Sequence, residues 1–416
     1  MNSLSVFIYD FSIRIYSLGI FVAAFFNSKA KMFWKGRMHL LSEIARTLRY
    51  NEKIIWMHCA SVGEFEQGKP VLEKIKSEFP QYKIVLTFYS PSGFNLRKKI
   101  SLADYIFYLP LDTKKNAEEF IRLVNPDLAI FVKYEFWYHH LNELHKKNIP
   151  SILISGIFRD DQIFFNWFGK PLQKILHFYQ MIFVQDENSF QLLKENGIVN
   201  SALSSDTRFD RVLQIKTEAK NFDEVEKFCN ENQVVVCGST WKEDQNIILD
   251  YIHSNPGSKL KWIIAPHEIF EETLQELQMQ LGEKSVRFSQ LNHADSEMQY
   301  LIIDNIGMLS GLYRYAKVAY VGGGFGKGIH NILEAAVYGA PVLFGPNYKK
   351  FKEATDLSEK KFCFSISGKS EFSNQLNELI ANQKLYSSCS EGCKNYVQSR
   401  AGATTQIVEY LKKHIH

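Results

Sequence analysis

Apolar residues along the chain gather in short runs, and the longer segments between the runs have helical periodicity. The first series of runs predicts strands at 54–59, 84–89, 105–109, 128–132, 151–155 and 181–184. After a polar stretch, 216–232, a second series predicts strands at 234–237, 262–265, 300–303, 318–321 and 342–344. Strands that alternate with helices form parallel sheets with helices on both faces. The sequence therefore predicts an α/β chain of two doubly wound, Rossmann-like domains that face a central cleft.

The segment 4–26 is apolar over about the 20 residues that span a bilayer. Only Asp10 and Arg14 interrupt it, and a basic segment with one tryptophan, 29–37, follows. The positive-inside tendency would keep the rest of the chain cytoplasmic. We predict that residues 1–30 form a membrane-anchor helix at the cytoplasmic face of the cell inner membrane. A spanning helix, an in-plane amphipathic helix and a buried core helix remain the three alternatives.

A glycine-rich turn joins the strands predicted at 318–321 and 342–344, in the sequence VGGGFGKGIHN. Glycines allow sharp turns and leave backbone N–H groups uncovered. We predict a helix that opens at His330 or Asn331 and stops at Gly339, with its N-terminus directed at a phosphate or carboxylate. Glu334, one turn into that helix, suits a sugar hydroxyl. The alternative is a tight connection that needs glycines only for packing.

Other predicted strands also end in polar residues. The first is followed by Ser61-Val62-Gly63-Glu64, which brings a carboxylate to the mouth of the predicted cleft. Glu64 could instead serve only the helix N-terminus, and Glu66 is the competing carboxylate. Three charged residues follow the strands predicted at 128–132 and 151–155, namely Lys133, Glu135 and Arg159. We expect them either to line the cleft or to form a solvated rim. In the second domain, Ser239 and Thr240 end one strand, and Pro266 and His267 end the next.

Composition and the absence of several catalytic motifs exclude some classes of protein. The 416 residues are 45% hydrophobic and 23% charged, which is enough for two well-packed domains. A net charge of +4 does not indicate nucleic acid, and six scattered cysteines indicate reduced cytosolic thiols. A Walker A lysine pattern, HExxH and GxSxG are absent from the sequence, and no first strand carries GxGxxG, so a dehydrogenase is disfavoured.

In order along the chain, HCASVGEF, KYEFW, SDTRFD, GSTWKEDQ, APHE and GKGIHNILEAAVYGAPVLFGP resemble the Kdo transferases of lipopolysaccharide biosynthesis. That family moves 3-deoxy-D-manno-octulosonic acid (Kdo) from CMP-Kdo to a lipid A precursor. The resemblance implies a GT-B glycosyltransferase, with an acceptor-binding domain at 31–211. A CMP-Kdo-binding domain with closing C-terminal helices would occupy 212–416. Two departures are Trp241, where the family commonly has the His of GSTH, and Ala265-Pro266-His267, where it commonly has an Arg beside the His of PRH.

The resemblance implies that Glu64 is the catalytic base of an inverting transfer to lipid IVA, without a cofactor or metal. The implied acceptor-binding residues are Ser61, Gly63, Lys133, Glu135 and Arg159. The implied donor-binding residues are Ser239, Thr240, Pro266, His267, Gly307, Gly326, Gly328, His330, Asn331 and Glu334. The expected partners are CMP-Kdo, the lipid A precursor and the membrane surface, and no nucleic acid. Two alternatives stay open: a GT-B enzyme for another nucleotide sugar, such as a UDP-sugar transferase or epimerase, and a non-catalytic, membrane-tethered nucleotide-binding protein.

Overall fold

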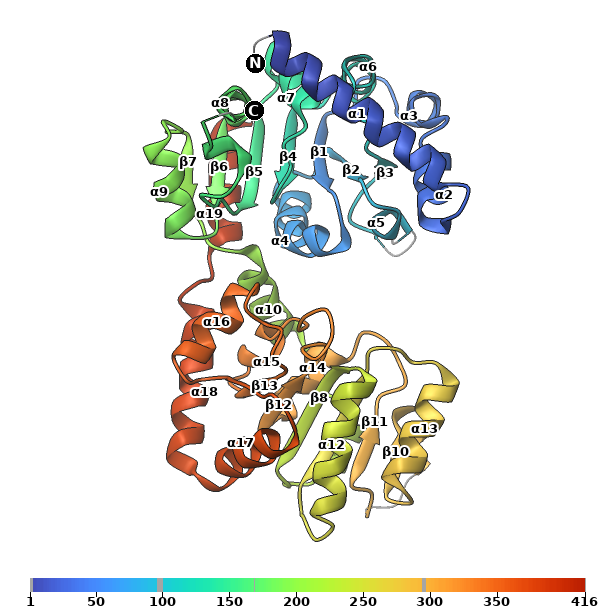
Figure 1. The fold of residues 1–416 in the computed structure, drawn as a ribbon, viewed down its shortest axis with the longest axis vertical. Coiled ribbons are helices and arrows are strands. Elements are labelled where there is room, and N and C mark those ends of the chain that lie inside the picture. The colour runs from blue at the N-terminus through green and yellow to red at the C-terminus, as the bar shows by residue number, and fades with distance from the viewer. Residues whose placement is uncertain (1–2, 96–99, 168, 294–296, 416) are drawn as a thin grey trace. The chain divides into compact units, whose positions relative to one another are not determined.

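The computed structural model describes residues 3–95, 100–167, 169–293 and 297–415. The chain divides into two compact units (Figure 1). Unit 1 holds residues 1–211 together with 401–416, and unit 2 holds residues 212–400.

Unit 1 is built on a parallel seven-stranded sheet in the order β3-β2-β1-β4-β5-β6-β7. Its strands are β1 (Ile54–Cys59), β2 (Lys83–Phe88), β3 (Tyr105–Tyr108), β4 (Leu128–Val132), β5 (Ser151–Gly156), β6 (Met181–Val184) and β7 (Ser201–Leu203). Every residue of β1 is buried. Its alternate side chains enter two different cores, with Trp56 in one and Met57 in the other. The central strands are thus apolar on both faces, which is why they appear as continuous apolar runs.

Helices cover both faces of this sheet. Its helices are α1 (Ser3–Ala23), α2 (Ser28–Lys35), α3 (Leu40–Thr47), α4 (Val62–Glu78), α5 (Pro91–Asn95), α6 (Lys114–Val124), α7 (Tyr138–Lys146), α8 (Lys170–Gln173), α9 (Glu187–Glu195) and α19 (Ala403–His414). Helix α10 (Thr207–Glu218) runs across the boundary to unit 2. Helices α3, α6 and α7 pack on one face, and α4 and α19 pack on the other.

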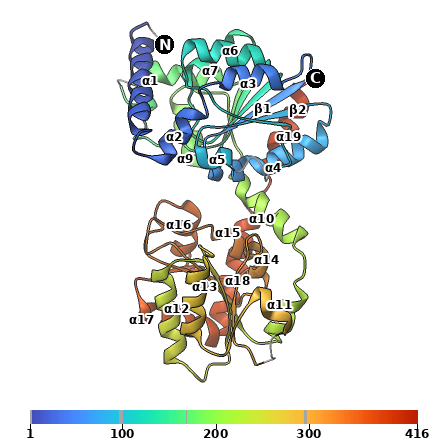
Figure 2. The same cartoon turned by 90° about the vertical axis from the view of Figure 1, so that its right-hand side faces the viewer.

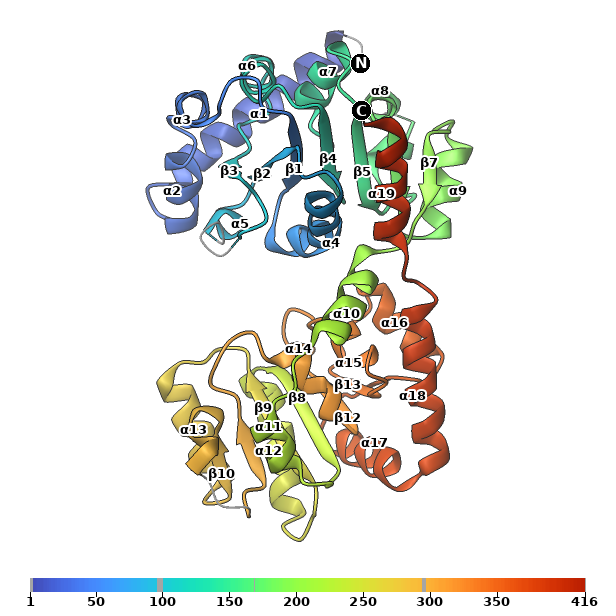
Figure 3. The ribbon, with the colours of Figure 1, turned by 180° about the vertical axis from the view of Figure 1, so that it is seen from behind.

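The C-terminal helix α19 belongs to unit 1, so the predicted second domain, 212–416, was wrong in including residues 401–416. Figure 3 shows α19, in dark red, on the same face of the sheet as α4. Ile407, Val408 and Leu411 are buried in the core that α4 also covers. Lys412 Nζ lies 3.2 Å from a carboxylate oxygen of Glu78. The amphipathic helix returns because its apolar stripe completes the cover of that sheet face.

Unit 2 repeats the architecture, in the strand order β10-β11-β9-β8-β12-β13-β14. Its strands are β8 (Val234–Thr240), β9 (Lys261–Pro266), β10 (Ser285–Arg287), β11 (Tyr300–Ile302), β12 (Val318–Val321), β13 (Val342–Phe344) and β14 (Phe364–Ser365). Its helices are α11 (Asp223–Cys229), α12 (Lys242–Ser254), α13 (Glu271–Leu281), α14 (Leu309–Leu312), α15 (Leu333–Ala336), α16 (Lys352–Glu359), α17 (Lys369–Ala381) and α18 (Gln383–Gln398). Helices α12, α13 and α17 share one core with the sheet and can be followed in Figure 2. The two doubly wound parallel sheets confirm the predicted α/β class.

Helix α1 lies along the α6/α7 face of unit 1 (Figure 1). On its inner side, Tyr9 donates a 2.5 Å hydrogen bond to Asp112, and Asp10 lies 2.5 Å from Nε2 of His139. On its outer side, large apolar residues are exposed, among them Phe7 (67%) and Leu18 (63%). By length and composition α1 is also the one helix of the described residues that is apolar enough to cross a membrane. None of that apolar window is buried, so the buried core helix is excluded.

Candidate active site

Glu64 stands in the first turn of α4, directly beyond the carboxyl end of β1. Its Oε2 accepts a 2.8 Å hydrogen bond from the backbone N–H of Ser61, and Oγ of Ser61 accepts one from the N–H of Glu64 at 3.4 Å. These two bonds form a capping box, so the predicted capping function of Glu64 is present. A carboxylate has about four lone-pair sites, so a capping bond to one oxygen leaves capacity for a substrate proton. A Cβ at exposed Gly63 would meet only Ser61 Oγ, at 4.0 Å.

The surroundings of Glu64 make its carboxylate a better proton acceptor than an ordinary glutamate. Burial raises its pKa most, and the nearby negative charge of Glu135 raises it further. His58, the N–H of Ser61 and Lys133 act in the opposite direction and limit the rise. A base with a raised pKa holds an abstracted proton more firmly. The competing Glu66 is exposed, as expected for a solvated position in the first turn.

Glu135 was predicted to bind the acceptor, and the structure corrects this assignment because only 2% of the residue is exposed. Its Oε2 lies 3.0 Å from Nε2 of His58 and accepts a hydrogen bond from the indole N–H of Trp137. His58 is also buried, with its Nδ1 2.8 Å from Oγ1 of Thr87. The buried pair therefore shapes the electrostatics around Glu64 and does not contact ligand from solvent. His58 was not predicted as a site residue, although it stands in the same HCASVGEF segment as Glu64.

Lys133 follows β4, the neighbour of β1, and Arg159 follows β5, the next strand along the sheet. Both cations lie next to Tyr134: the Lys133 ammonium is 5.3 Å from the centre of its ring, and Arg159 donates a 3.1 Å hydrogen bond to its hydroxyl. Arg159 is exposed and Lys133 is partly exposed. The structure thus brings Ser61, Glu64, Lys133 and Arg159 to one edge of the sheet, the carboxyl edge.

In unit 2, the glycine-rich turn after β12 is a compact loop that folds back on β8 and β13. A Cβ on Gly322 would lie 2.4 Å from the carbonyl oxygen of Ser239, and one on Gly324 would lie 2.6 Å from the backbone of Gly345. Packing alone therefore demands these two glycines, as the alternative interpretation proposed. At Gly326 a Cβ would meet only Gly323 O, at 3.7 Å, so packing does not demand glycine there.

The helix after this loop is shorter and later than predicted. Helix α15 is a single turn that begins at Leu333, with Oδ1 of Asn331 accepting from the N–H of Leu333 at 3.2 Å. A backbone bond from the N–H of His330 to the carbonyl of Gly322 keeps the preceding residues in the loop. One turn aligns few peptide dipoles, so the predicted attraction of a helix N-terminus for phosphate is weak here. Glu334 accepts a 3.2 Å hydrogen bond from the side chain of Asn331.

Asp244, which was not among the predicted site residues, holds this loop in place. Its Oδ2 accepts hydrogen bonds from the N–H groups of Trp241 at 2.8 Å and Gly323 at 2.9 Å. Its Oδ1 accepts from the hydroxyl of Tyr320 at 2.6 Å, and only 1% of Asp244 is exposed. One carboxylate thus ties the start of α12 to the glycine loop and to β12. The spacing of Asp244 from Trp241 is that of a capping residue, which is the signal that could have revealed it.

Three aromatic rings stack beside this loop. The ring centres of Trp241 and His267 are 4.4 Å apart, and those of His267 and His330 are 4.6 Å apart. The residues come from the ends of the neighbouring strands β8, β9 and β12. Most of the predicted donor-binding residues meet at this edge, namely Ser239, Thr240, Pro266, His267, Gly326, Gly328, His330, Asn331 and Glu334. Gly307 follows β11, one strand beyond β9.

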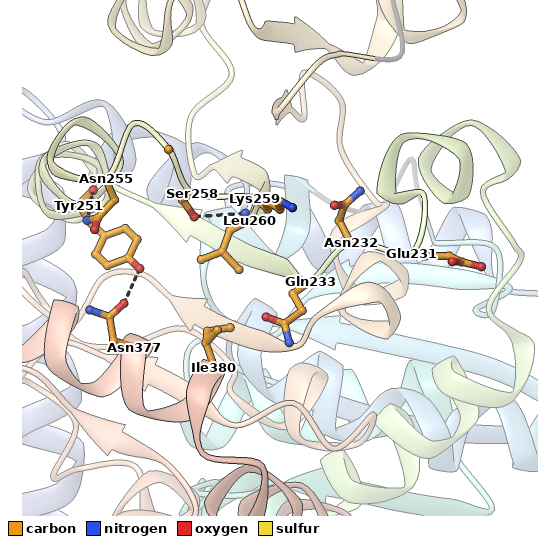
Figure 4. A pocket seen from close by; sticks show the side chains of 11 residues that line it. Glu231, Asn232, Gln233, Tyr251, Asn255, Ser258, Lys259, Leu260, Asn377 and Ile380 are labelled. Atoms are coloured by element: carbon orange, nitrogen blue, oxygen red, sulfur yellow. Dashed lines mark hydrogen bonds between the residues drawn. The ribbon is translucent and has the colours of Figure 1, made fainter.

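A separate cavity of about 650 Å³ lies at the opposite edge of the same sheet. Figure 4 shows the side chains that line it, including Gln233 before β8, Leu260 before β9 and Asn377 of α17. Because the strands are parallel, their amino ends form this edge and their carboxyl ends form the ring-stack edge. The cavity is therefore not part of the predicted donor site.

Comparison with known proteins shows which proteins this chain resembles. A sequence model described as 3-deoxy-D-manno-octulosonic-acid transferase (kdotransferase) matches residues 33–211. A 3-deoxy-D-manno-octulosonic acid transferase of Chlamydia trachomatis serovar A is 26% identical, over 95% of this chain and 93% of its own. Residues 33–211 therefore match the Kdo transferase family, and the chain is similar to Kdo transferases over most of its length. A second Kdo transferase, from Aquifex aeolicus, is 28% identical over 79% of this chain and 87% of its own. The protein is accordingly a glycosyltransferase.

A solved structure supports the fold of this chain over both units. UDP-GlcNAc 2-epimerase from Neisseria meningitidis, bound to UDP-GlcNAc, superposes with a TM-score of 0.60. The match covers 87% of this chain and all of the epimerase, at 15% identity. At that identity the similarity shows the fold alone, and it confirms the predicted GT-B class.

Proposed function

We propose that this Kdo transferase moves Kdo from CMP-Kdo to the lipid A precursor lipid IVA, with Glu64 as the general base. The observation that carries the proposal is the position of Glu64, a partly buried carboxylate at the carboxyl end of β1 with a raised pKa. An acceptor sugar hydroxyl has to lose a proton as it attacks, and a positioned carboxylate can take it. The alternative base, Glu66, is exposed and turned to solvent.

The chemical step is a single displacement that inverts the anomeric carbon of Kdo. The acceptor oxygen forms a bond to that carbon while the bond from the carbon to the CMP phosphate oxygen breaks. The leaving CMP takes the bonding electron pair, and the hydroxyl proton passes to the carboxylate of Glu64. Glu64 later releases this proton to solvent. The exposed Arg159 and the partly exposed Lys133, at the same edge, suit the anionic groups of a lipid A precursor.

The donor is held in unit 2 at the carboxyl edge of the sheet. Ser239, His330 and Asn331 offer hydroxyl, imidazole and amide donors to the single phosphate of CMP-Kdo. Glu334 offers a carboxylate to a sugar hydroxyl. The transfer needs no divalent metal in this proposal, because CMP leaves with one phosphate and the sequence contains no Asp-x-Asp motif.

The enzyme acts at the cytoplasmic face of the inner membrane, where a lipid acceptor is available. Two features support this location: the exposed apolar side of α1, and the basic residues Lys29, Lys31 and Lys35 that follow it. Apolar side chains can enter the acyl boundary while the basic residues attract anionic lipid.

The direct test compares nucleotides as ligands of the full-length protein. CMP should raise its melting temperature more than UMP, UDP or NAD at equal concentration, because only a ligand of the native state stabilises it. A clear preference for UDP or UMP would contradict the CMP-Kdo assignment and favour another nucleotide sugar. Incubation with CMP-Kdo and lipid IVA should then yield a Kdo-lipid product. Binding of CMP without any product would favour a binding protein over an enzyme.

A further inference from the structure

Trp241 makes a directed polar contact with His330 in addition to their shared ring stack. The indole Nε1 of Trp241 lies 3.3 Å from Nε2 of His330. Trp241 is 38% exposed, and its ring packs on His267, which in turn packs on His330. The backbone of Trp241 is fixed as well, because its N–H is bonded to the buried Asp244. Both ends of the contact are thus held by the surrounding structure.

The chemistry of the two rings decides the direction of this bond. An indole nitrogen can only donate, so Nε2 of His330 has to accept and cannot carry a hydrogen. A neutral imidazole carries one ring hydrogen, which must then sit on Nδ1. Within the described residues, no hydrogen bond is formed by Nδ1 of His330. That N–H therefore remains available to a ligand.

Burial and the neighbouring His267 also favour the neutral form of His330. Burial lowers its pKa most, and the stacked His267 lowers the pKa further. Asp244, on the α12 side, is the charged group that opposes this shift. Asp244 is itself engaged by three donors, the N–H groups of Trp241 and Gly323 and the hydroxyl of Tyr320.

We propose that Trp241 is a positioning residue that holds His330 as the neutral tautomer with its hydrogen on Nδ1, so that one directed N–H donor faces the phosphate of the sugar nucleotide. This inference rests on the proposed function for the identity of the ligand, and on the ring geometry for the tautomer. It gives a function to a tryptophan whose ring nitrogen can only donate. A phenylalanine here would keep the stack and lose the donor.

The tautomer is measurable without any ligand. Full-length protein labelled with ring-¹⁵N histidine distinguishes protonated from unprotonated ring nitrogens by their chemical shifts, and His330→Asn assigns the His330 signals. We expect hydrogen on Nδ1 in the wild type and its movement to Nε2 in Trp241→Phe. The matched control, His267→Phe, changes the middle ring of the stack and should leave the hydrogen on Nδ1. A wild-type hydrogen on Nε2, or an unchanged tautomer in Trp241→Phe, would overturn the proposal.

Calorimetric titration with CMP tests the consequence for binding. Trp241→Phe should weaken CMP binding about threefold to tenfold, the effect of one poorly directed hydrogen bond. Unchanged CMP affinity in a variant whose tautomer has moved would overturn the positioning function of Trp241. Failure of the wild type to bind CMP would instead contradict the proposed function and leave the tautomer result standing. If Trp241→Phe does not fold, Trp241→Leu, which lacks both ring and donor, replaces it in both measurements.

Discussion

The carboxylate of Glu135 lies 3.0 Å from the imidazole of His58, and both side chains are buried beneath the carboxyl edge of the unit 1 sheet. The pair acts on Glu64 in opposite directions, since Glu135 raises the pKa of Glu64 and His58 lowers it. Burial of Glu64 itself is the larger cause of the raised pKa. The chemistry of the proposed base is therefore set partly by residues that the substrate does not touch.

If Glu64 takes the acceptor proton, Glu64→Gln should lower turnover by about 10²- to 10⁴-fold, because the amide keeps the shape and removes the basicity. The measurement is Kdo transfer to lipid IVA by purified variants. Glu66→Gln, two residues along on the same helix, is the matched control and should keep near-normal turnover. CMP binding should survive in both variants, because the donor residues belong to unit 2. Near-normal turnover by Glu64→Gln would refute the assignment.

The raised pKa of Glu64 predicts the pH profile. A base works only when deprotonated, so kcat/KM should fall on the acid side at a pH above 4.5, the ordinary glutamate value. Glu135→Gln removes the neighbouring negative charge and should shift this acid limb to lower pH. An acid limb that stays in place would show that Glu135 does not act on the base. The variant leaves His58 without its carboxylate, so its fold should be checked by thermal unfolding.

The same shift has a consequence for stability. Because folding raises the pKa of Glu64, its contribution to stability is complete below the unfolded value and is lost as the pH rises through the folded value. Glu64→Gln is neutral throughout and should lose less stability than the wild type across that window. The measurement is the free energy of unfolding of both proteins at a series of pH values from about 4 to 8. Parallel curves would argue against a raised pKa.

Asp244→Ala should lower the free energy of unfolding by about 2–4 kcal/mol, because it leaves several buried donors without an acceptor. It should also weaken CMP binding, since the N–H of Gly323 is one of those donors. The matched variant Tyr320→Phe removes only one of the three bonds and should cost about 0.5–1.5 kcal/mol. Denaturant unfolding measures the loss of unfolding free energy in each variant. Equal losses in the two variants would contradict the organising function of Asp244.

The two sides of α1 predict a separation between membrane binding and folding. Replacing Phe7, Phe11 and Leu18 together by serine alters only the exposed side and should reduce sedimentation with anionic lipid vesicles, with little change in melting temperature. Tyr9→Phe, on the side of α1 that contacts unit 1, removes the hydrogen bond to Asp112. It should lower the melting temperature and leave sedimentation with vesicles nearly unchanged. Vesicle binding by the triple variant equal to that of the wild type, in high salt, would refute the anchor assignment, because salt screens basic attraction.

Much of the fold could be predicted from local sequence. The runs 54–59, 128–132 and 318–321 became β1, β4 and β12 with the predicted bounds, because central strands buried on both faces have to be continuously apolar. The edge strands β7, β10 and β14 were not predicted. Each has only two or three residues, which is too short to give a pattern.

The sequence alone determined the alternation of strands and helices along the chain, the polar residues at the strand ends and the position of Glu64. Strand ends and helix starts are local signals, so they can be found without the tertiary structure. Only the tertiary structure decided which partners those residues have. Glu135 and His58 were brought together from separate strand ends, and α19 returned to unit 1 across almost the whole chain. Asp244 joined Trp241 to Gly323 over a long sequence separation. Such contacts depend on how helices and sheets pack, and packing joins residues whose distance along the sequence carries no information about their distance in space.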